Sequence, residues 1–193
     1  MVLRHYTPIA ANTYIYSIGT LGFLYLQGIG ECCAGSVCIP ATSPVDLNWF
    51  HSIELNELHL ALVRQNLLDE WMPEIEIRSR NELTNQGHAK DYDAIVTLRF
   101  GSSRPRFALE YERSPKTSRQ YDGIRKATDR ETRVDEILYL VANDHLQRFL
   151  MQCFAQTKRR LYIGRASEFP LKLLDTPVVE AATGRQMKFG ETL

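Results

Sequence analysis

Three acidic residues lie at the ends of two neighbouring segments that read as β-strands. Asp93 opens the first segment, and Glu110 and Glu112 close the second. Residues 101–105 between them are rich in Gly, Ser and Pro, which predicts an antiparallel hairpin. In such a hairpin the start of the first strand lies beside the end of the second, and residues two apart share a face. We therefore expect these three carboxylates to converge at one end of a sheet.

Converging carboxylates point to metal chemistry on phosphate esters. They repel one another unless a positive charge lies among them. Mg²⁺ binds one or two protein carboxylates and keeps the rest of its shell for water and phosphate oxygens. Such an ion polarises a phosphodiester and lowers the pKa of an attacking water. The spacing alone is equally typical of acids on a solvated strand end, next to the arginines that follow.

Asp93, sixteen further residues and then Glu110-Tyr111-Glu112 resemble the PD-(D/E)xK nuclease motif. In that motif two acids bind metal, and a lysine two residues after the second acid assists the water. Tyr92 stands where the motif often has proline, and Glu112 stands in place of the lysine. Some type II restriction enzymes are active with this Glu-x-Glu version. The resemblance implies that Asp93 and Glu110 bind Mg²⁺ or Mn²⁺, while Glu112 completes the shell or holds the attacking water.

Residues 51–154 resemble the replication-relaxation family of plasmids and other mobile elements. The matching features are a helix after His51, Trp71 followed by Glu74, the Tyr-Asp strand, the Glu-x-Glu-Arg strand end and a lysine-bearing helix. The resemblance implies an α/β fold of the restriction-endonuclease-like type, with an α-β-β-β-α-β core and a mixed sheet. Residues 15–26 resemble the last wing strand and closing helix of a winged helix. Expected partners are DNA, other replication or mobile-element proteins and a second copy of the chain.

The same resemblance adds candidate catalytic residues from neighbouring helices. Lys126 corresponds to the helix lysine that would steady developing charge, with Lys116 as the second choice. Glu74 matches a family glutamate. In several nucleases of this type a glutamate of the first helix reaches the metal, which makes Glu57 or Glu54 a candidate. An exposed helix acid is the more common alternative for such a residue.

A locally basic stretch accompanies the acidic site. Residues 99–133 contain ten Lys and Arg but five Asp and Glu, although the formal net charge of the whole chain is zero. This distribution suits a phosphodiester substrate, whereas a solvated helix face is the simpler explanation. The residues expected to contact the DNA backbone are Arg113, Lys116, Arg119 and Arg125.

Composition indicates an ordinary globular protein. The 193 residues are 44% hydrophobic and 24% charged, which excludes the disordered and fibrous classes. The uncharged run 14–30 is interrupted by tyrosines and glycines and predicts a strand and a helix, so no membrane partner is expected. The cysteines, Cys32, Cys33, Cys38 and Cys153, lack the spacing of a zinc site. We interpret them as reduced thiols of a cytoplasmic protein.

Periodicity predicts the elements that position these residues. Residues 1–30 form a strand and helix segment, 31–48 a linker, 49–169 the nuclease-like core and 170–193 an extension. Ser114 is expected to cap the helix after the hairpin, and His51 to be a helix cap or core contact. The expected helices are 19–27, 49–71, 115–132 and 145–158, and the expected strands are 13–18, 74–78, 91–100, 106–113, 136–142, 161–164 and 177–180.

Three functions remain open on the sequence alone. The first is a metal-dependent DNA endonuclease or nickase. The second is a non-catalytic DNA-binding or adaptor protein on a nuclease-like scaffold, which the missing strand lysine favours. The third is a protein-binding structural module that binds neither metal nor DNA.

Overall fold

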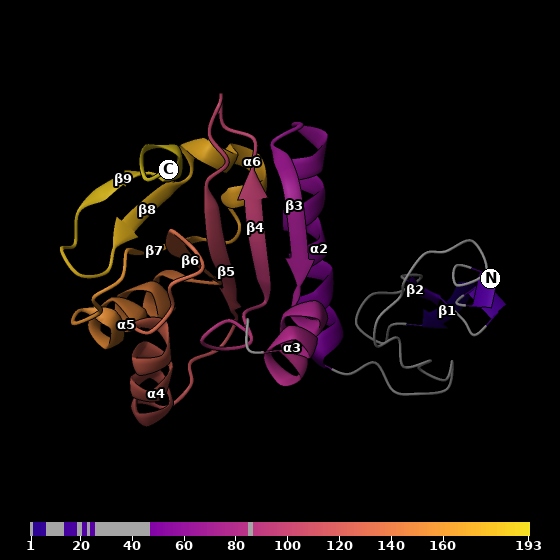
Figure 1. Ribbon diagram of the computed structural model, residues 1–193, viewed down its shortest axis with the longest axis horizontal. Helices are drawn as coiled ribbons and strands as arrows, with labels where there is room; N and C mark the ends of the chain where they lie inside the picture. The colour runs from indigo at the N-terminus through magenta and orange to yellow at the C-terminus, as the bar shows by residue number, and fades with distance from the viewer. Residues whose placement is uncertain (1, 7–13, 19–20, 23, 26–46, 85–86) are drawn as a thin grey trace. The chain divides into compact units, whose positions relative to one another are not determined.

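A computed structural model describes the chain except for residues 1, 7–13, 19–20, 23, 26–46 and 85–86 (Figure 1). The chain divides into two compact units, Met1–Phe50 and His51–Leu193. In the first unit, strand β1 (Val2–Tyr6) pairs with strand β2 (Tyr14–Ile18) in an antiparallel hairpin. The predicted strand at 13–18 is therefore present, and its partner β1 was not predicted.

The second unit is an α/β structure built on a seven-stranded mixed sheet in the order β3-β4-β5-β6-β7-β8-β9 (Figure 1). The pairs β5–β6 and β6–β7 are parallel, and the other four pairs are antiparallel. The strands are β3 (Leu68–Pro73), β4 (Ala94–Leu98), β5 (Arg106–Glu112), β6 (Glu136–Val141), β7 (Leu161–Arg165), β8 (Pro177–Glu180) and β9 (Gln186–Lys188).

Helices cover both faces of this sheet. Two short 3₁₀ helices, Leu173–Asp175 and Phe189–Glu191, lie near the C-terminus. One core joins α2 and α6 to one face, and a second core joins α3, α4 and α5 to the other. The helices are α2 (Leu47–Arg64), α3 (Glu74–Leu83), α4 (Ser118–Thr128), α5 (Asp144–Phe154) and α6 (Phe169–Lys172).

The predicted hairpin is formed by β4 and β5, and it ends in a turn in which Gly101 has φ +59°. Because side chains alternate along a strand, Phe107 and Leu109 face α2, while Ala108 belongs to the opposite core. By the same alternation Glu110 shares the face of Ala108. The helix α4 then crosses back so that β6 runs parallel to β5.

The first helix of this unit ends earlier than predicted. The apolar spacing predicts a helix to Trp71, but α2 ends at Arg64 and the chain continues into β3. Asn66 adopts φ +54°, a left-handed conformation that stops a helix and that Asn tolerates better than most residues. Strand β3 then pairs with β4, where Met72 is fully buried. The prediction was wrong because leucines and a tryptophan suit a half-buried strand as well as a helix.

The predicted strand at residues 74–78 is also wrong, because these residues begin helix α3. Pro73 precedes this helix, as suits a residue without an N–H group. Glu74 pairs with Arg78 and Glu76 pairs with Arg80, both at the i,i+4 spacing of a helix. Ile77 is buried whereas Ile75 is 44% exposed, so the alternating letters do not correspond to alternating faces of a strand.

Several other expectations fall at the ends of the chain. The predicted C-terminal extension contributes β8 and β9 to the main sheet. The helix predicted at residues 19–27, the linker and the cysteines other than Cys153 lie wholly or largely outside the described residues. Cys153 is a free thiol. None of the helices in the described part of the chain has the length and apolar character needed to cross a bilayer.

Candidate active site

Asp93 directly precedes β4 and meets the end of β5, as predicted. The register Ala94 to Leu109, continued by one residue, places Asp93 opposite Glu110. One carboxylate oxygen of Asp93 lies 3.0 Å from Nε2 of His51, and the other accepts a hydrogen bond of 2.6 Å from the backbone N–H of Tyr111. The His51 ring also stacks on Tyr111, with 5.5 Å between ring centroids. Asp93 is therefore fixed by both α2 and β5.

Glu110 is a buried carboxylate with a lysine against it. Its exposed fraction is 8%, and Lys90 Nζ donates to its Oε1. Burial raises the pKa of Glu110 to about 7; the positive charges of Lys90 and Lys116 oppose this rise, and the negative charge of Asp93 adds to it. Lys90, Asp93 and Lys116 therefore each lie within electrostatic reach of Glu110.

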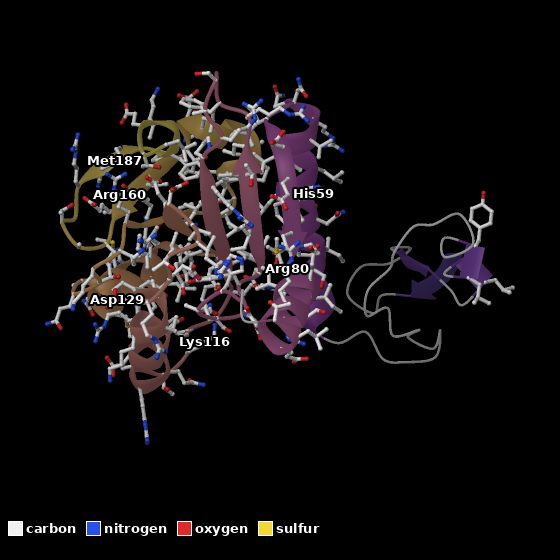
Figure 2. The ribbon with its side chains drawn as sticks, viewed as in Figure 1. His59, Arg80, Lys116, Asp129, Arg160 and Met187 are labelled. Carbon is white, nitrogen blue, oxygen red and sulfur yellow. The ribbon has the colours of Figure 1, made fainter. Side chains whose placement is uncertain are left out.

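Glu112 lies on the same face of β5 and is paired with Lys116. Lys116, labelled in Figure 2, lies in the connection between β5 and α4. Its Nζ donates to Glu112 Oε2. Helix α4 begins with a capping box in which Thr117 accepts from Gln120 N at 3.3 Å and the Gln120 side chain accepts from Thr117 N at 2.8 Å. The cap is thus Thr117 rather than the predicted Ser114. Lys116, the second choice in the sequence, is the predicted lysine that reaches an acid of the site.

A hollow of about 260 Å³ opens beside Asp93. His51, His59, Trp71 and Glu74 are among its lining residues. The hydrogen bond to Asp93 raises the pKa of His51; burial opposes this rise, and the charges of Asp93, Glu74 and Glu110 support it. Glu74 therefore lies near the site, as the family resemblance implies, although it comes from a helix.

The other predicted residues contact groups other than these carboxylates. Glu57 is exposed on α2 and lines a separate hollow of about 240 Å³ that includes Tyr111 and Ser167. Glu54 lies 3.3 Å from Nε of Arg113. Lys126 is 67% exposed and contacts Asp122 at 2.8 Å in the last turn of α4.

Two of the arginines expected to contact DNA lie on α4. Arg119 is exposed in its first turn. Arg125 is largely buried and contacts Asp122 at 2.7 Å and Asp129 at 3.5 Å. Its charge is therefore shared with two carboxylates.

Within the described ranges, no three His, Cys, Asp or Glu side chains lie where they could together hold a metal ion. A two-carboxylate site for Mg²⁺ or Mn²⁺ needs less, because water and substrate oxygens supply the remaining ligands. Asp93 and Glu110 provide the hard oxygen donors such ions prefer, and each Asp93 oxygen keeps a second lone pair. For a divalent cation to bind there, the Lys90 ammonium group would have to move away from Glu110.

Two residues of the site, Lys90 and His51, were not identified from the sequence. Lys90 lies three residues before Asp93, and this position is the indication that the sequence offers for it. His51 was expected as a helix cap or core contact, yet it lies inside α2 and bonds to Asp93. That contact spans 42 positions in the chain, so local patterns do not predict it.

No family model matches the chain, and comparisons with curated proteins and with solved structures found no match either.

Proposed function

We propose that the chain is a metal-dependent nuclease that hydrolyses phosphodiester bonds of DNA as an endonuclease or a nickase. The observation that carries this proposal is the buried carboxylate of Glu110 among Asp93, Lys90 and Lys116. Oxygen donors of this kind suit a divalent cation, and the lysines suit a negatively charged substrate. Perturbed titratable groups at a converging strand end are typical of functional sites.

The arrangement of the second unit is compatible with the resemblance to restriction-endonuclease-like proteins. The elements α2, β3, β4, β5, α4 and β6 follow the α-β-β-β-α-β order, with α3 added after β3. The sheet is mixed, and the candidate acids lie at the end of its central hairpin. The hairpin β1–β2 is compatible with the wing of a winged helix.

The residues of the site divide the work of hydrolysis as follows. Asp93 and Glu110 would hold Mg²⁺ or Mn²⁺, which when bound polarises the phosphodiester and lowers the pKa of water. Glu112 orients the attacking water, and Lys116 provides positive charge where the phosphate becomes more negative. Lys116 takes this role in place of Lys126, which pairs with Asp122. Arg113 and Arg119 contact the DNA backbone without reading its sequence.

Plasmid nicking tests this proposal. The protein should convert supercoiled plasmid to open circles in the presence of Mn²⁺ and should stop when EDTA is added. Asp93→Asn and Glu110→Gln should each lower the rate by about 10²-fold or more, because each removes a metal ligand. Glu70→Gln is the control, because Glu70 is an exposed acid on β3, whose Leu68 end pairs with the far end of β4. A rate that is equal in all three variants would refute the proposal.

A non-catalytic DNA-binding or adaptor protein is the second candidate, because each acid of the site already has a partner. Asp93 bonds to His51, Glu110 to Lys90 and Glu112 to Lys116. Under this alternative the wild type binds DNA in EDTA and leaves plasmid intact with Mn²⁺. Asp93→Asn should then leave the affinity for DNA unchanged, while Arg119→Glu should weaken it.

A further inference from the structure

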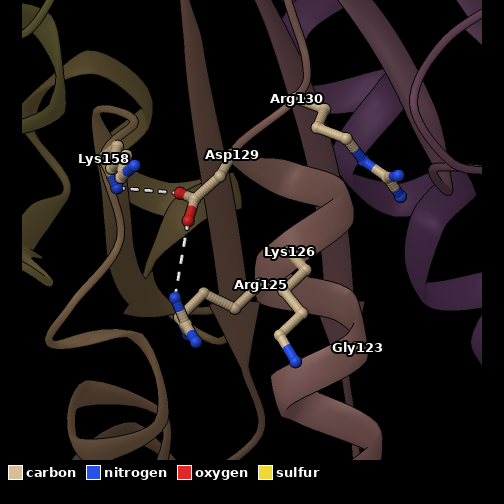
Figure 3. A pocket seen from close by; sticks show the side chains of 6 residues that line it. All are labelled: Gly123, Arg125, Lys126, Asp129, Arg130 and Lys158. Atoms are coloured by element: carbon tan, nitrogen blue, oxygen red, sulfur yellow. Dashed lines mark hydrogen bonds and ion pairs between the residues drawn. The ribbon is translucent and has the colours of Figure 1, made fainter.

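A basic hollow lies at the end of α4, away from the strand ends that carry the candidate active site. It has a volume of about 610 Å³, and Figure 3 shows its lining, in which Asp129 lies between Lys158 and Arg125. The six lining residues come from α4, the turn that follows it and the turn before β7. They are Gly123, Arg125, Lys126, Asp129, Arg130 and Lys158.

The lining of this basic hollow has four cations and one acid, and Asp122 beside it pairs with Arg125 and Lys126, so the local charge is positive. Asp129 is its acid, and the Oδ1 atom of Asp129 already accepts hydrogen bonds of 2.8 Å from the Thr157 hydroxyl and from the Lys158 N–H. In the part of the chain that the structure describes, the side chains of Arg130 and Lys158 form no ion pair. An anion could therefore bind these two cations without breaking a contact of the fold.

Gly123 leaves open space in the lining of the basic hollow. It lies in the middle of α4, and its φ is not positive, so its backbone conformation suits any residue. A Cβ built on Gly123 has nothing within 4 Å, so packing does not require glycine either. A glycine in a helix interior lowers helix stability relative to alanine or glutamine. Its remaining advantage is that a ligand can approach the helix backbone closely at this point.

One face of α4 leads from its first turn, at Arg119, to the basic hollow. Arg119, Gly123 and Lys126 recur at intervals of four and three residues, so they share a face of the helix. Helix α4 begins at Ser118, and from there to Lys126 its rise is about 12 Å, or roughly three to four nucleotides of one strand at 3.4 Å each. A strand whose phosphate lies at Arg119 can thus follow this face to the basic hollow.

We propose that the basic hollow binds backbone phosphates of a polynucleotide strand, several nucleotides along that strand from the phosphate held at Lys116. This inference rests on the proposed function, since it extends the path of the same substrate. Arg130 and Lys158 bind the phosphates, Lys126 and Arg125 add positive potential, and Gly123 leaves room for the strand. The contacts are to phosphate, so they add affinity without sequence preference.

Fluorescence anisotropy of a labelled single-stranded oligonucleotide in EDTA tests this proposal without requiring cleavage. The double variant Arg130→Ala/Lys158→Ala should bind about tenfold or more weakly, and the slope of log affinity against log salt should fall by about 1.4, or ~0.7 per lost phosphate contact. Gly123→Gln should also bind more weakly while its melting temperature rises, since glutamine is the better helix former. Lys172→Ala and Lys188→Ala, which remove exposed lysines of α6 and β9, are the controls.

The outcomes separate this inference from the proposed nuclease. If wild type binds the oligonucleotide but never cleaves DNA, and the variants still lose affinity, the basic hollow is supported and the nuclease is refuted. If the variants bind like wild type, or wild type does not bind at all, the inference is wrong. Calorimetry with pyrophosphate tests the alternative that the basic hollow binds small phosphate compounds. Binding of pyrophosphate as tight as that of the oligonucleotide, lost in the same variants, would also overturn the polynucleotide assignment.

Discussion

Burial raises the pKa of the Glu110 carboxyl to about 7, and Lys90 and Lys116 counteract this only in part. Below that pH the group holds a proton, which competes with any cation for the same oxygens. We expect the affinity for Mn²⁺ to fall by roughly tenfold for each pH unit below about 7 and to level off above it. Calorimetry in buffers of different ionisation enthalpy should detect a proton released on binding near pH 6. The Glu110→Gln variant should release none, and an affinity that is constant with pH would contradict the assignment of Glu110 as a ligand.

Glu131 is a second buried carboxylate, and its function is structural. It accepts hydrogen bonds from the backbone N–H groups of Ala89 at 2.9 Å and Arg133 at 2.7 Å, and His88 Nδ1 lies 3.6 Å away. Burial acts to raise the pKa of Glu131, but these contacts outweigh it and lower the pKa to about 2. Because the folded pKa is lower than the unfolded value near 4.5, the group stabilises the fold above that value.

The stability linked to Glu131 should therefore depend on pH. It is fully present above about pH 5, amounts to about 3 kcal/mol and is lost as the pH falls towards 2. Urea unfolding should find Glu131→Gln less stable than wild type by a similar amount at pH 7, with the difference shrinking in acid. An equal loss at pH 7 and pH 3 would mean that packing, rather than charge, accounts for the effect.

The local sequence predicts the acids of the candidate site, but it does not predict the residues that bond to them. Asp93, Glu110 and Glu112 belong to one hairpin, whose register follows from alternation and a short turn. His51 bonds to Asp93 across 42 positions, and Lys90 bonds to Glu110 across 20. Such contacts depend on how a helix and a loop pack on the sheet, and this information is not local in the chain.

At the scale of elements, α2 ends where Asn66 turns the chain towards β3. Asn66 has φ +54°, and its side-chain oxygen accepts a hydrogen bond of 2.8 Å from Arg99. We expect Asn66→Val to destabilise the protein by about 1–2 kcal/mol, because a β-branched residue is strained in the left-handed region. Asn66→Gly should stay within about 0.5 kcal/mol of wild type, since glycine tolerates this φ. Thermal and urea unfolding of the two variants measure the difference, and an equal loss in both would assign the effect to the lost Arg99 contact.

Elements with one clear period were predicted well, and elements with an ambiguous period were not. The buried apolar run of β6 and the three- and four-residue spacing of α5 match their predicted positions to within a few residues. Residues 74–78 alternate like a strand, yet ion pairs at i,i+4 and the burial of Ile77 stabilise a helix there. Over a stretch this short, tertiary contacts outweigh the local pattern.

At the scale of the whole molecule, positive and negative charges are equal in number, but cations are in excess in some regions. The formal net charge is zero, so long-range attraction of DNA is weak. Cations of α4 and of the turn before β7 gather instead around the basic hollow. Association with DNA should therefore depend on these local contacts, and its salt dependence should follow their number.

The unit His51–Leu193 contains both hydrophobic cores and the whole seven-stranded sheet. A chain that starts at Leu47, where α2 begins, keeps all of these elements. We expect it to unfold in one cooperative transition with a midpoint within about 3 °C of that seen for the full chain. Scanning calorimetry measures this directly. A midpoint lower by about 10 °C would mean that residues before Leu47 stabilise the sheet.

The matched control removes the other end of the chain. A variant that stops before Thr176 loses β8 and β9 together with Val178 and Phe189, both of which have an exposed fraction of 0%. The Phe189 ring packs edge-on against Phe107 of β5, with 5.0 Å between ring centroids. Losing these two side chains alone should remove about 3–6 kcal/mol, which is a large part of the stability of a typical domain. This variant should therefore fail to unfold cooperatively, because residues 170–193 belong to the same folded unit as the candidate active site.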